Sequence, residues 1–146
     1  MKNLTLAAAL ALLSAPAFAE SHASGNAEAG MEAFERQCVS CHVVADGDTI
    51  LAGRSADTGP NLFMVAGRVP GSVEGFEYGE SLVEYGALGV VWDEETFVAY
   101  VQDPTDFLRE ALDNRRARGK MAFQVRDEQE AHDIYAYLVS LAPAAQ

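Results

Sequence analysis

The sequence predicts a single all-α domain in which short helices are joined by long loops. Apolar residues recur at helical spacing in several segments, whereas no segment alternates convincingly between apolar and polar residues as a half-buried strand does. Glycine and proline interrupt the chain between the helical segments. Apolar residues make up 49% of the 146 residues, which is enough for one folded domain. Short helices and long loops provide little core, so we expect something large and apolar to fill the middle.

Three helices begin at polar residues that are typical N-caps. Asn26 precedes a helix that ends near Cys38, and Asp93 precedes a helix that runs to about Gln102. Asp103 is followed by a proline, which is the preferred pattern at the start of a further helix. The helices at both ends of the chain carry an apolar stripe that would face a core.

The last helix is the most strongly indicated of all. Asp127 and Glu130 have the spacing of a capping box, with Asp in place of Ser or Thr, and Pro143 follows the end of the helix. Apolar residues repeat with helical period along it, at Ala131, Ile134, Tyr135, Leu138 and Leu141.

The remaining segments are predicted to be irregular. Residues 42–58 should form a loop with a turn at 46–48, and residues 67–79 should form a wrapping loop. We expect short helical pieces at 62–66 and 81–85, and an extended basic segment at 115–123.

Residues 1–19 are predicted to be a cleaved export signal, which leaves residues 20–146 as the mature domain. Lys2 is followed by an apolar run from Leu4 to Leu13, and Ala17-Phe18-Ala19 is a small-x-small cleavage site before Glu20. The alternative is an uncleaved membrane anchor, but the apolar run is well short of the roughly 20 residues that a spanning helix needs. A soluble protein of the periplasm is therefore expected.

The formal charge of −12 argues against nucleic acid as a partner, because phosphate binding requires a basic surface. The basic residues are nevertheless concentrated. Six of the ten Lys and Arg residues lie in one short segment, at Arg109, Arg115, Arg116, Arg118, Lys120 and Arg126. This segment is either a solvated helix end and loop or a docking surface.

The motif that indicates a function is Cys38-Val39-Ser40-Cys41-His42, which is the C-x-x-C-H attachment signature for c-type haem. Two thiols at this spacing can form thioethers with two vinyl groups of one porphyrin, and the following His is placed to ligate the iron. An export signal fits this interpretation, because bacteria attach the cofactor outside the cytoplasm.

Three other interpretations of the two cysteines are weaker. A redox-active C-x-x-C belongs at a helix N-terminus in a strand-rich fold, whereas this motif closes a helix. A structural zinc site usually has four ligands, and His42 with the two cysteines gives three. A surface disulfide would be ordinary in an exported protein but would not require His42.

A second axial ligand would come from the remaining histidines or methionines. Met31 and Met64 are expected to be core residues. We expect His22 in a frayed lead and His132 on the solvated side of the last helix. Met121 differs because it lies in an irregular segment between Gly119 and Phe123. Sulfur is a soft donor that suits iron, yet core packing is an equally good explanation of Met121 on spacing alone.

With these residues in view, the chain resembles the family of mitochondrial cytochrome c and bacterial cytochrome c2 over about residues 25–141. Gly30 and Phe34 resemble the residues of the first helix that cross the last one, where Ile134, Tyr137 and Leu138 match. Thr58-Gly59-Pro60-Asn61-Leu62 resembles the turn beside the axial histidine. The resemblance implies one covalent haem c inside a cytochrome c fold of three main helices, and a hydrogen bond from His42 to the Pro60 carbonyl.

The resemblance also implies other residues that contact the haem. Arg68, Tyr78 and Trp92 match residues that bind the haem propionates, and Arg68 has a physical reason to do so because a buried carboxylate needs a partner. Aromatic core is the alternative for Tyr78 and Trp92. Tyr100 matches an aromatic residue packed near the axial methionine.

Lys120-Met121-Ala122-Phe123 resembles the family's K-M-x-F motif. This implies that His42 and Met121 are the iron ligands and that Phe123 covers the exposed haem edge. Two features depart from the shorter members. Gly119 replaces a common Thr, which puts one propionate hydrogen bond in doubt, and insertions lie within 43–57 and 109–118. Such insertions are similar to those of the longer cytochromes c2 of purple bacteria.

The resemblance implies an electron-transfer protein rather than an enzyme. The chain would be a monomer that carries single electrons from a quinol–cytochrome c oxidoreductase to a photosynthetic reaction centre, a terminal oxidase or both. Partner docking would use five basic residues around the haem edge, namely Arg36, Arg115, Arg116, Arg118 and Lys120. Two rival functions stay open: a haem enzyme with an open iron site, and a colourless thiol redox or binding module.

Overall fold

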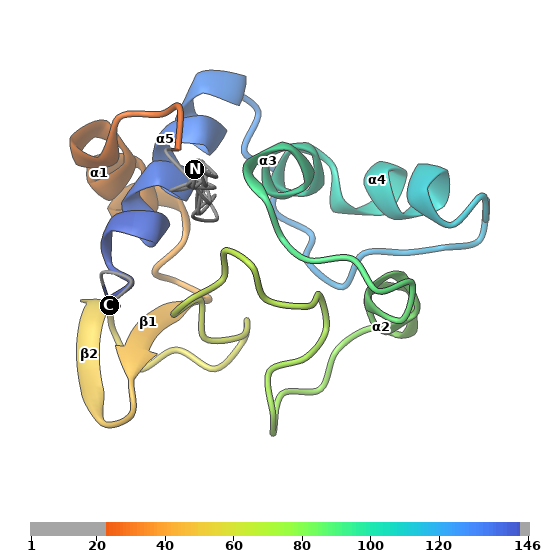
Figure 1. The fold of residues 1–146 in the computed structure, drawn as a ribbon, viewed down its shortest axis with the longest axis horizontal. Coiled ribbons are helices and arrows are strands. Elements are labelled where there is room, and N and C mark those ends of the chain that lie inside the picture. Colours follow the sequence, from red (N-terminus) through yellow and green to blue (C-terminus); the bar gives the residue numbers. More distant parts are fainter. Residues whose placement is uncertain (1–22, 144–146) are drawn as a thin grey trace, which may run out of the picture.

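The computed structural model describes residues 23–143, which form five helices and one hairpin (Figure 1). The elements are α1 Ala27–Gln37, β1 Val43–Asp46, β2 Thr49–Gly53, α2 Glu80–Gly86, α3 Glu94–Gln102, α4 Pro104–Ala111 and α5 Glu128–Ser140. The export signal, its cleavage site and His22 lie outside the described residues. Within residues 23–143, no helix combines the length and the apolar character needed to cross a bilayer.

The predicted helix starts are confirmed by the hydrogen bonds that cap them. The Asn26 side chain accepts from the backbone N–H groups of Glu28 and Ala29, and Asp103 accepts from the N–H of Asp106. Asp93 forms a full capping box, because its carboxylate accepts from the N–H of Thr96 and the Thr96 hydroxyl accepts from the N–H of Asp93. Local sequence therefore fixes where these helices begin.

The capping box expected at the start of α5 is only half present. Asp127 accepts from the N–H of Glu130, as predicted. The Glu130 carboxylate instead accepts from Arg36 at 2.7 Å and from the Gln37 amide at 2.7 Å, both at the end of α1. A tertiary contact between the two helices has thus replaced the local one.

The prediction of a loop through residues 42–58 is wrong, because β1 and β2 pair there as an antiparallel hairpin with an irregularity between Val44 and Ala45. The turn was placed correctly, and Gly47 supplies its left-handed conformation with φ of 56°. The strands are only four and five residues long and bury one side chain each, Val44 and Ala52. Two such short strands carry too little alternation to be found from sequence.

Helices α1 and α5 cross at Gly30, as the resemblance implied. A side chain at Gly30 would overlap the backbone carbonyl of Asp133, so only glycine allows the two backbones to approach this closely. Beside the crossing, the rings of Phe34 and Tyr137 lie 5.6 Å apart, and Ile134 is buried.

A second packed cluster lies on the other side of the molecule, where α2, α4 and the residues before α3 meet (Figure 1). Its centre is aromatic: Trp92 lies 5.1 Å from Tyr100, and Phe107 lies 5.1 Å from Tyr85 between ring centroids. The irregular segment from the hairpin to α2 connects the two sides. The buried residues of both sides belong to one hydrophobic core, in which Phe97 of α3 lies 5.3 Å from Tyr135 of α5 between ring centroids. A cavity opens within this core.

Candidate haem site

A cavity of about 590 Å³ opens between the α1–α5 pair and the aromatic cluster. Its walls come from segments that are far apart in the sequence, including the end of α1, the 58–68 segment, α3 and residues 120–125. The residues with predicted haem contacts all line it: Cys38, Cys41, His42, Pro60, Arg68, Tyr78, Trp92, Tyr100, Met121 and Phe123. This agrees with the expectation that the domain encloses something large and apolar.

The two cysteines reach the cavity because α1 stops at Gln37 and the chain turns immediately. Cys38 is the C-cap of α1, and its carbonyl accepts from the N–H groups of Cys41 at 3.1 Å and His42 at 2.9 Å. Cys38 and Cys41 form no disulfide with each other. Burial, together with the neighbouring Cys41, raises the pKa of the Cys38 thiol to about 12. A redox-active dithiol needs a lowered pKa, so this environment disfavours the thiol redox interpretation.

The His42 imidazole is held by the Pro60 carbonyl, which lies 2.9 Å from Nδ1. The resemblance implied this hydrogen bond. It places the proton on Nδ1, since the carbonyl can only accept, and leaves Nε2 as the nitrogen that can ligate a metal. Burial lowers the pKa of His42, against a smaller opposite effect of the Pro60 bond. The imidazole is therefore kept neutral, which is the ligating form.

Gly59 is a further residue of the site that the sequence interpretation treated only as part of a turn. A Cβ at this position would lie 2.6 Å from His42 Nδ1, so the imidazole packs directly against the bare backbone. The Gly59 N–H also donates to the Cys41 carbonyl at 2.7 Å. The Gly-Pro pair at 59–60 thus supplies the space for the ring and the acceptor that orients it.

The Arg68 guanidinium lines the cavity and is fixed by two backbone carbonyls. Its terminal nitrogens donate to Phe63 at 2.8 Å and to Asn61 at 3.0 Å. Burial lowers the pKa of Arg68, and the nearby Tyr78 phenol partly offsets this. A half-buried guanidinium of this kind is suited to a carboxylate partner, so the predicted contact with a propionate fits the site.

The polar ends of two tyrosines share this part of the wall. Burial raises the pKa of Tyr100 to about 12 and also raises that of Tyr78. Both phenols are thus protonated donors at neutral pH. Trp92 is buried beside Tyr100 and belongs to the aromatic cluster. It is therefore a core residue as well as a residue that lines the cavity.

Met121 lines the cavity, whereas neither Met31 nor Met64 does so. The expectation that Met31 and Met64 are core residues is wrong, because they are 44% and 53% exposed. Met31 lies on the outer side of α1, and Met64 occupies a left-handed turn with φ of 53°. Among residues 23–143, Met121 is therefore the methionine available to a group in the cavity.

Position 119 is glycine here, whereas the family commonly has threonine, and the structure shows a steric reason for the difference. A Cβ at Gly119 would lie 2.7 Å from the Cβ of Pro104, at the start of α4. The Gly119 N–H donates to the Thr105 hydroxyl at 3.1 Å. The chain that leads to Met121 is thus packed tightly against α4, and a threonine would not fit there without movement.

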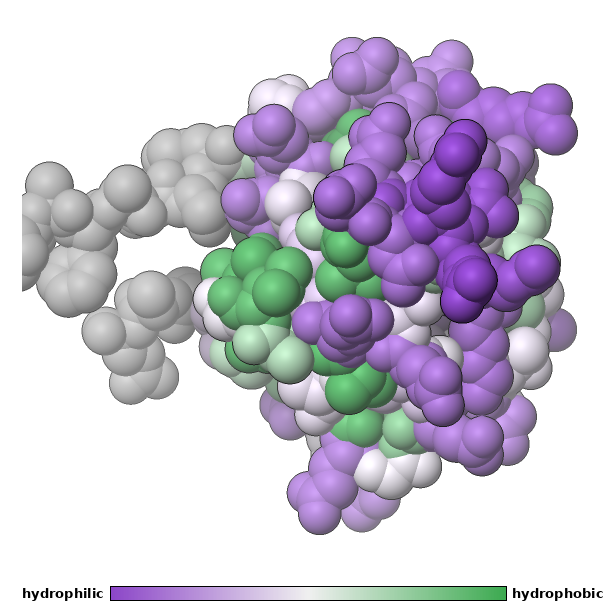
Figure 2. Space-filling view, turned by 90° about the vertical axis from the view of Figure 1, so that its right-hand side faces the viewer, coloured by the Kyte–Doolittle hydropathy of each residue, from purple (hydrophilic) through white to green (hydrophobic). Residues whose placement is uncertain are grey.

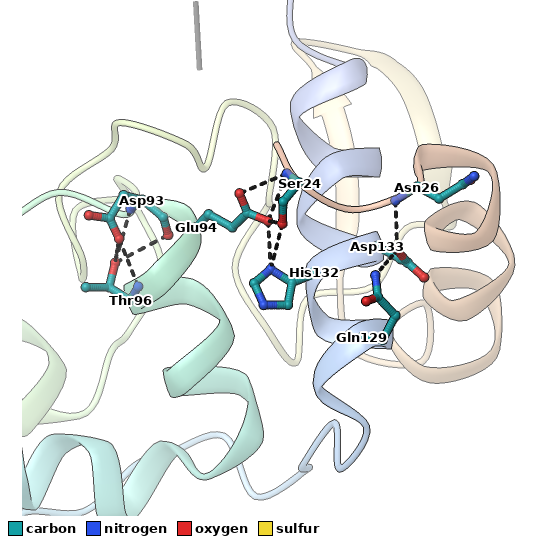
Figure 3. Close-up of polar contacts among 8 residues, drawn as sticks. All are labelled: Ser24, Asn26, Asp93, Glu94, Thr96, Gln129, His132 and Asp133. Carbon is teal, nitrogen blue, oxygen red and sulfur yellow. Dashed lines mark hydrogen bonds and ion pairs between the residues drawn. The ribbon is translucent and has the colours of Figure 1, made fainter. Parts of the chain in front are cut away.

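His132 was expected to be solvated, but only 27% of its side chain is exposed, and it does not line the cavity. Its Nδ1 lies 2.7 Å from a Glu94 carboxylate oxygen and 3.2 Å from the Ser24 hydroxyl (Figure 3). The three residues join the N-terminal lead, α3 and α5. Because they are far apart in the sequence, no local pattern could have revealed this contact.

Four of the five predicted docking residues are exposed in the segment after α4 and before Met121. Figure 2 looks onto this side of the molecule, where the most hydrophilic side chains gather in one area. Lys120 donates to the Glu77 carbonyl, and its ammonium lies 5.6 Å from the Phe76 ring centroid. Arg36 differs, because its charge is paired with Glu130 at 2.7 Å.

A helical domain folded around an apolar cavity, with C-x-x-C-H on one wall and a methionine on another, has the features of a c-type cytochrome. A comparison with models of protein families gave no match. Cytochrome c2 of Rhodovulum adriaticum is 58% identical over 120 residues, which cover 81% of this chain and 94% of the relative. Cytochrome c2 of Cereibacter sphaeroides is 50% identical over 139 residues, which cover 94% and 93%.

Solved structures of cytochromes are similar to this chain as well. The crystal structure of cytochrome c2 from Rhodobacter sphaeroides has a TM-score of 0.78 at 52% identity and covers 82% of this chain and 98% of its own. Ferric cytochrome c-550 from Paracoccus versutus has a TM-score of 0.75 at 36% identity, covering 82% and 100%. The chain belongs to the cytochrome c2 family. It is an electron-transfer protein with one covalently attached haem c, not an enzyme.

Proposed function

We propose that this cytochrome is a periplasmic one-electron carrier whose haem iron is ligated by His42 and Met121. When bound, the haem supplies a metal centre that cycles between two oxidation states. The residues of the chain hold its two axial ligands in place, exclude water and present one edge of the cavity to partners. Ligands retained in both oxidation states keep the geometry nearly constant, which favours fast electron transfer.

The observation that carries this proposal is that His42 and Met121 line the same cavity, with His42 Nδ1 already bonded to Pro60. Nε2 of His42 and the thioether sulfur of Met121 are thus two donors that line the cavity and suit a haem iron. The exposure of Met31 and Met64 supports Met121 further, since neither competes for the cavity. A methionine ligand and apolar surroundings both raise the reduction potential.

The rival function, a haem enzyme with an open iron site, requires that Met121 does not ligate. Optical spectra of the holoprotein in both oxidation states distinguish the two. We expect the iron–thioether charge-transfer band in the wild type, its loss in Met121→Ala, and its retention in Met64→Ala, which is a matched control on an exposed methionine. An unchanged band in Met121→Ala, or rapid binding of carbon monoxide by the reduced wild type at neutral pH, would favour the rival.

We propose that the electron donor is a quinol–cytochrome c oxidoreductase and that the acceptor is a photosynthetic reaction centre, a terminal oxidase or both. The exposed residues Arg115, Arg116, Arg118 and Lys120 support docking to acidic surfaces, since they concentrate positive charge on an acidic protein. Arg36 is a weaker candidate because Glu130 already neutralises it. Redox encounters of this kind bury little surface and weaken as salt rises.

The periplasmic location rests on the predicted signal at residues 1–19. The intact mass of the protein recovered from a periplasmic fraction tests it. We expect a chain that begins at Glu20 and carries one haem, whereas a chain that retains Met1 in a membrane fraction would contradict the proposal.

A further inference from the structure

Asn61 is held far more firmly than a residue of a simple turn. Its side-chain oxygen accepts from the Ala45 N–H at 3.0 Å, and its side-chain nitrogen donates to the Ala45 carbonyl at 2.7 Å. The same oxygen accepts from the Phe63 N–H at 3.0 Å. The Asn61 amide therefore pairs with both backbone groups of one strand residue, much as a neighbouring strand would.

The segment around Asn61 runs along the edge of β1 and is fixed on both sides. Before it, the Gly59 N–H donates to the Cys41 carbonyl at 2.7 Å, and after it the Leu62 N–H donates to the Val43 carbonyl at 2.9 Å. The Asn61 carbonyl accepts from Arg68 at 3.0 Å. These contacts attach the segment to the hairpin and to the Arg68 guanidinium.

Pro60 lies in the middle of this attached segment, and its carbonyl is the acceptor for His42 Nδ1. That carbonyl belongs to the planar peptide unit shared by Pro60 and Asn61. The proline ring fixes φ of Pro60, so the direction of the carbonyl depends on ψ of Pro60 and on where Asn61 is held. The side-chain pairing of Asn61 with Ala45 restricts this remaining freedom, together with the backbone bonds on either side.

We propose that Asn61 is a positioning residue for the axial histidine: its pairing with Ala45 aims the Pro60 carbonyl at His42 Nδ1 and thereby sets the basicity of the imidazole. No residue of the hairpin at 43–53 lines the cavity. The hairpin would thus act on the redox centre through Asn61, Pro60 and His42. The inference rests on the proposed ligation by His42. A strong bond at Nδ1 increases electron donation to iron and stabilises the oxidised form.

Asn61→Ser tests the proposal in the holoprotein. The serine hydroxyl can still accept from the Phe63 N–H, because serine forms the same side-chain-to-backbone turn as asparagine. The serine side chain is too short to reach the backbone N–H and carbonyl of Ala45. We expect hydrogen exchange of the His42 Nδ1 proton, followed by NMR of the reduced protein, to become about tenfold faster. At equilibrium with one redox mediator, the ratio of reduced to oxidised cytochrome should be about three times higher in Asn61→Ser than in the wild type.

Asn114→Ser is the matched control, because Asn114 accepts from the Arg116 N–H two residues on and does not line the cavity. It should leave both quantities at wild-type values. An Asn61→Ser protein that exchanges at the wild-type rate, even if less stable, would overturn the proposal. Asn61→Asp is a second variant of nearly the same size. It replaces the donor to the Ala45 carbonyl with a carboxylate oxygen that repels this carbonyl, so a wild-type exchange rate there would also overturn the proposal.

Failure of the ligation proposal is distinguishable from failure of this inference. The ring protons of an iron-bound His42 are strongly shifted by the porphyrin ring current in the reduced wild type. If these shifts are missing from the wild type, His42 is not the ligand. If they are present and Asn61→Ser exchanges normally, only the role of Asn61 is rejected.

Discussion

Gly30 of α1 lies directly against the backbone carbonyl of Asp133 in α5, with no room for a side chain between them. The contact joins the two ends of the described chain, and Ile134, the residue after Asp133 in α5, lines the cavity. Because the obstacle is backbone, it cannot move aside as a flexible side chain would.

Gly30→Ala is therefore expected to destabilise the protein by about 3 kcal/mol, the upper part of the range for overpacking. The free energy of unfolding from denaturant titration of the holoprotein measures this. Glu32→Ala, at an exposed position of α1, should change it by less than about 0.5 kcal/mol. Equal stability of the two variants would show that the helices can separate without cost.

Gly119→Thr restores the residue common in the family and should nevertheless destabilise this protein by about 1 kcal/mol or more. The new Cβ would lie 2.7 Å from Pro104 and displace the chain that leads to Met121. Thermal unfolding measures the loss, and the thioether band reports whether Met121 stays in place. If Gly119→Thr is more stable than the wild type, the start of α4 can move to accommodate the new side chain.

The contact between Glu94 and His132 predicts a pH dependence of stability (Figure 3). Burial raises the pKa of Glu94, but hydrogen bonds from Ser24 and His132 together lower it below its ordinary 4.5. A carboxylate with a lowered pKa stabilises the fold above pH 4.5, and this contribution is lost as the pH falls through the folded value.

Glu94→Gln should thus cost on the order of 1 kcal/mol at pH 7, and the difference from wild type should shrink below pH 4.5. Glu95→Gln is the control, since Glu95 lies in the same first turn of α3 and is exposed. Urea unfolding across this pH range provides the measurement. A deficit in Glu94→Gln that does not depend on pH would exclude titration of Glu94 as the cause.

Arg118→Glu should slow second-order electron transfer from a quinol–cytochrome c oxidoreductase several-fold at low salt, because it reverses charge in the proposed docking segment. The rates of variant and wild type should converge as salt rises, since screening removes the steering. Stopped-flow kinetics at several ionic strengths measure both effects.

Arg54→Glu makes the same charge change beyond β2, on the opposite side of the molecule from the segment after α4 (Figure 1). It should leave the rate nearly unchanged. If the two variants lose rate equally, net charge governs the encounter and the docking segment has no special role.

The sequence by itself determined the helix starts and the attachment motif. Asn26, Asp93 and Asp103 cap helices through atoms two or three residues away, so the necessary partners are adjacent in the chain. The C-x-x-C-H motif is equally local, since its chemistry depends on the spacing of neighbouring residues. Such features can be found without knowing the fold.

Only the tertiary structure decided which methionine reaches the cavity, that His132 pairs with Glu94, and that Asn61 holds Ala45. Each of these depends on segments brought together from distant parts of the chain, and the short hairpin at 43–53 was missed for the same reason. Its strands are stabilised by pairing with each other and with the 59–62 segment, and such pairing leaves almost no pattern within either strand.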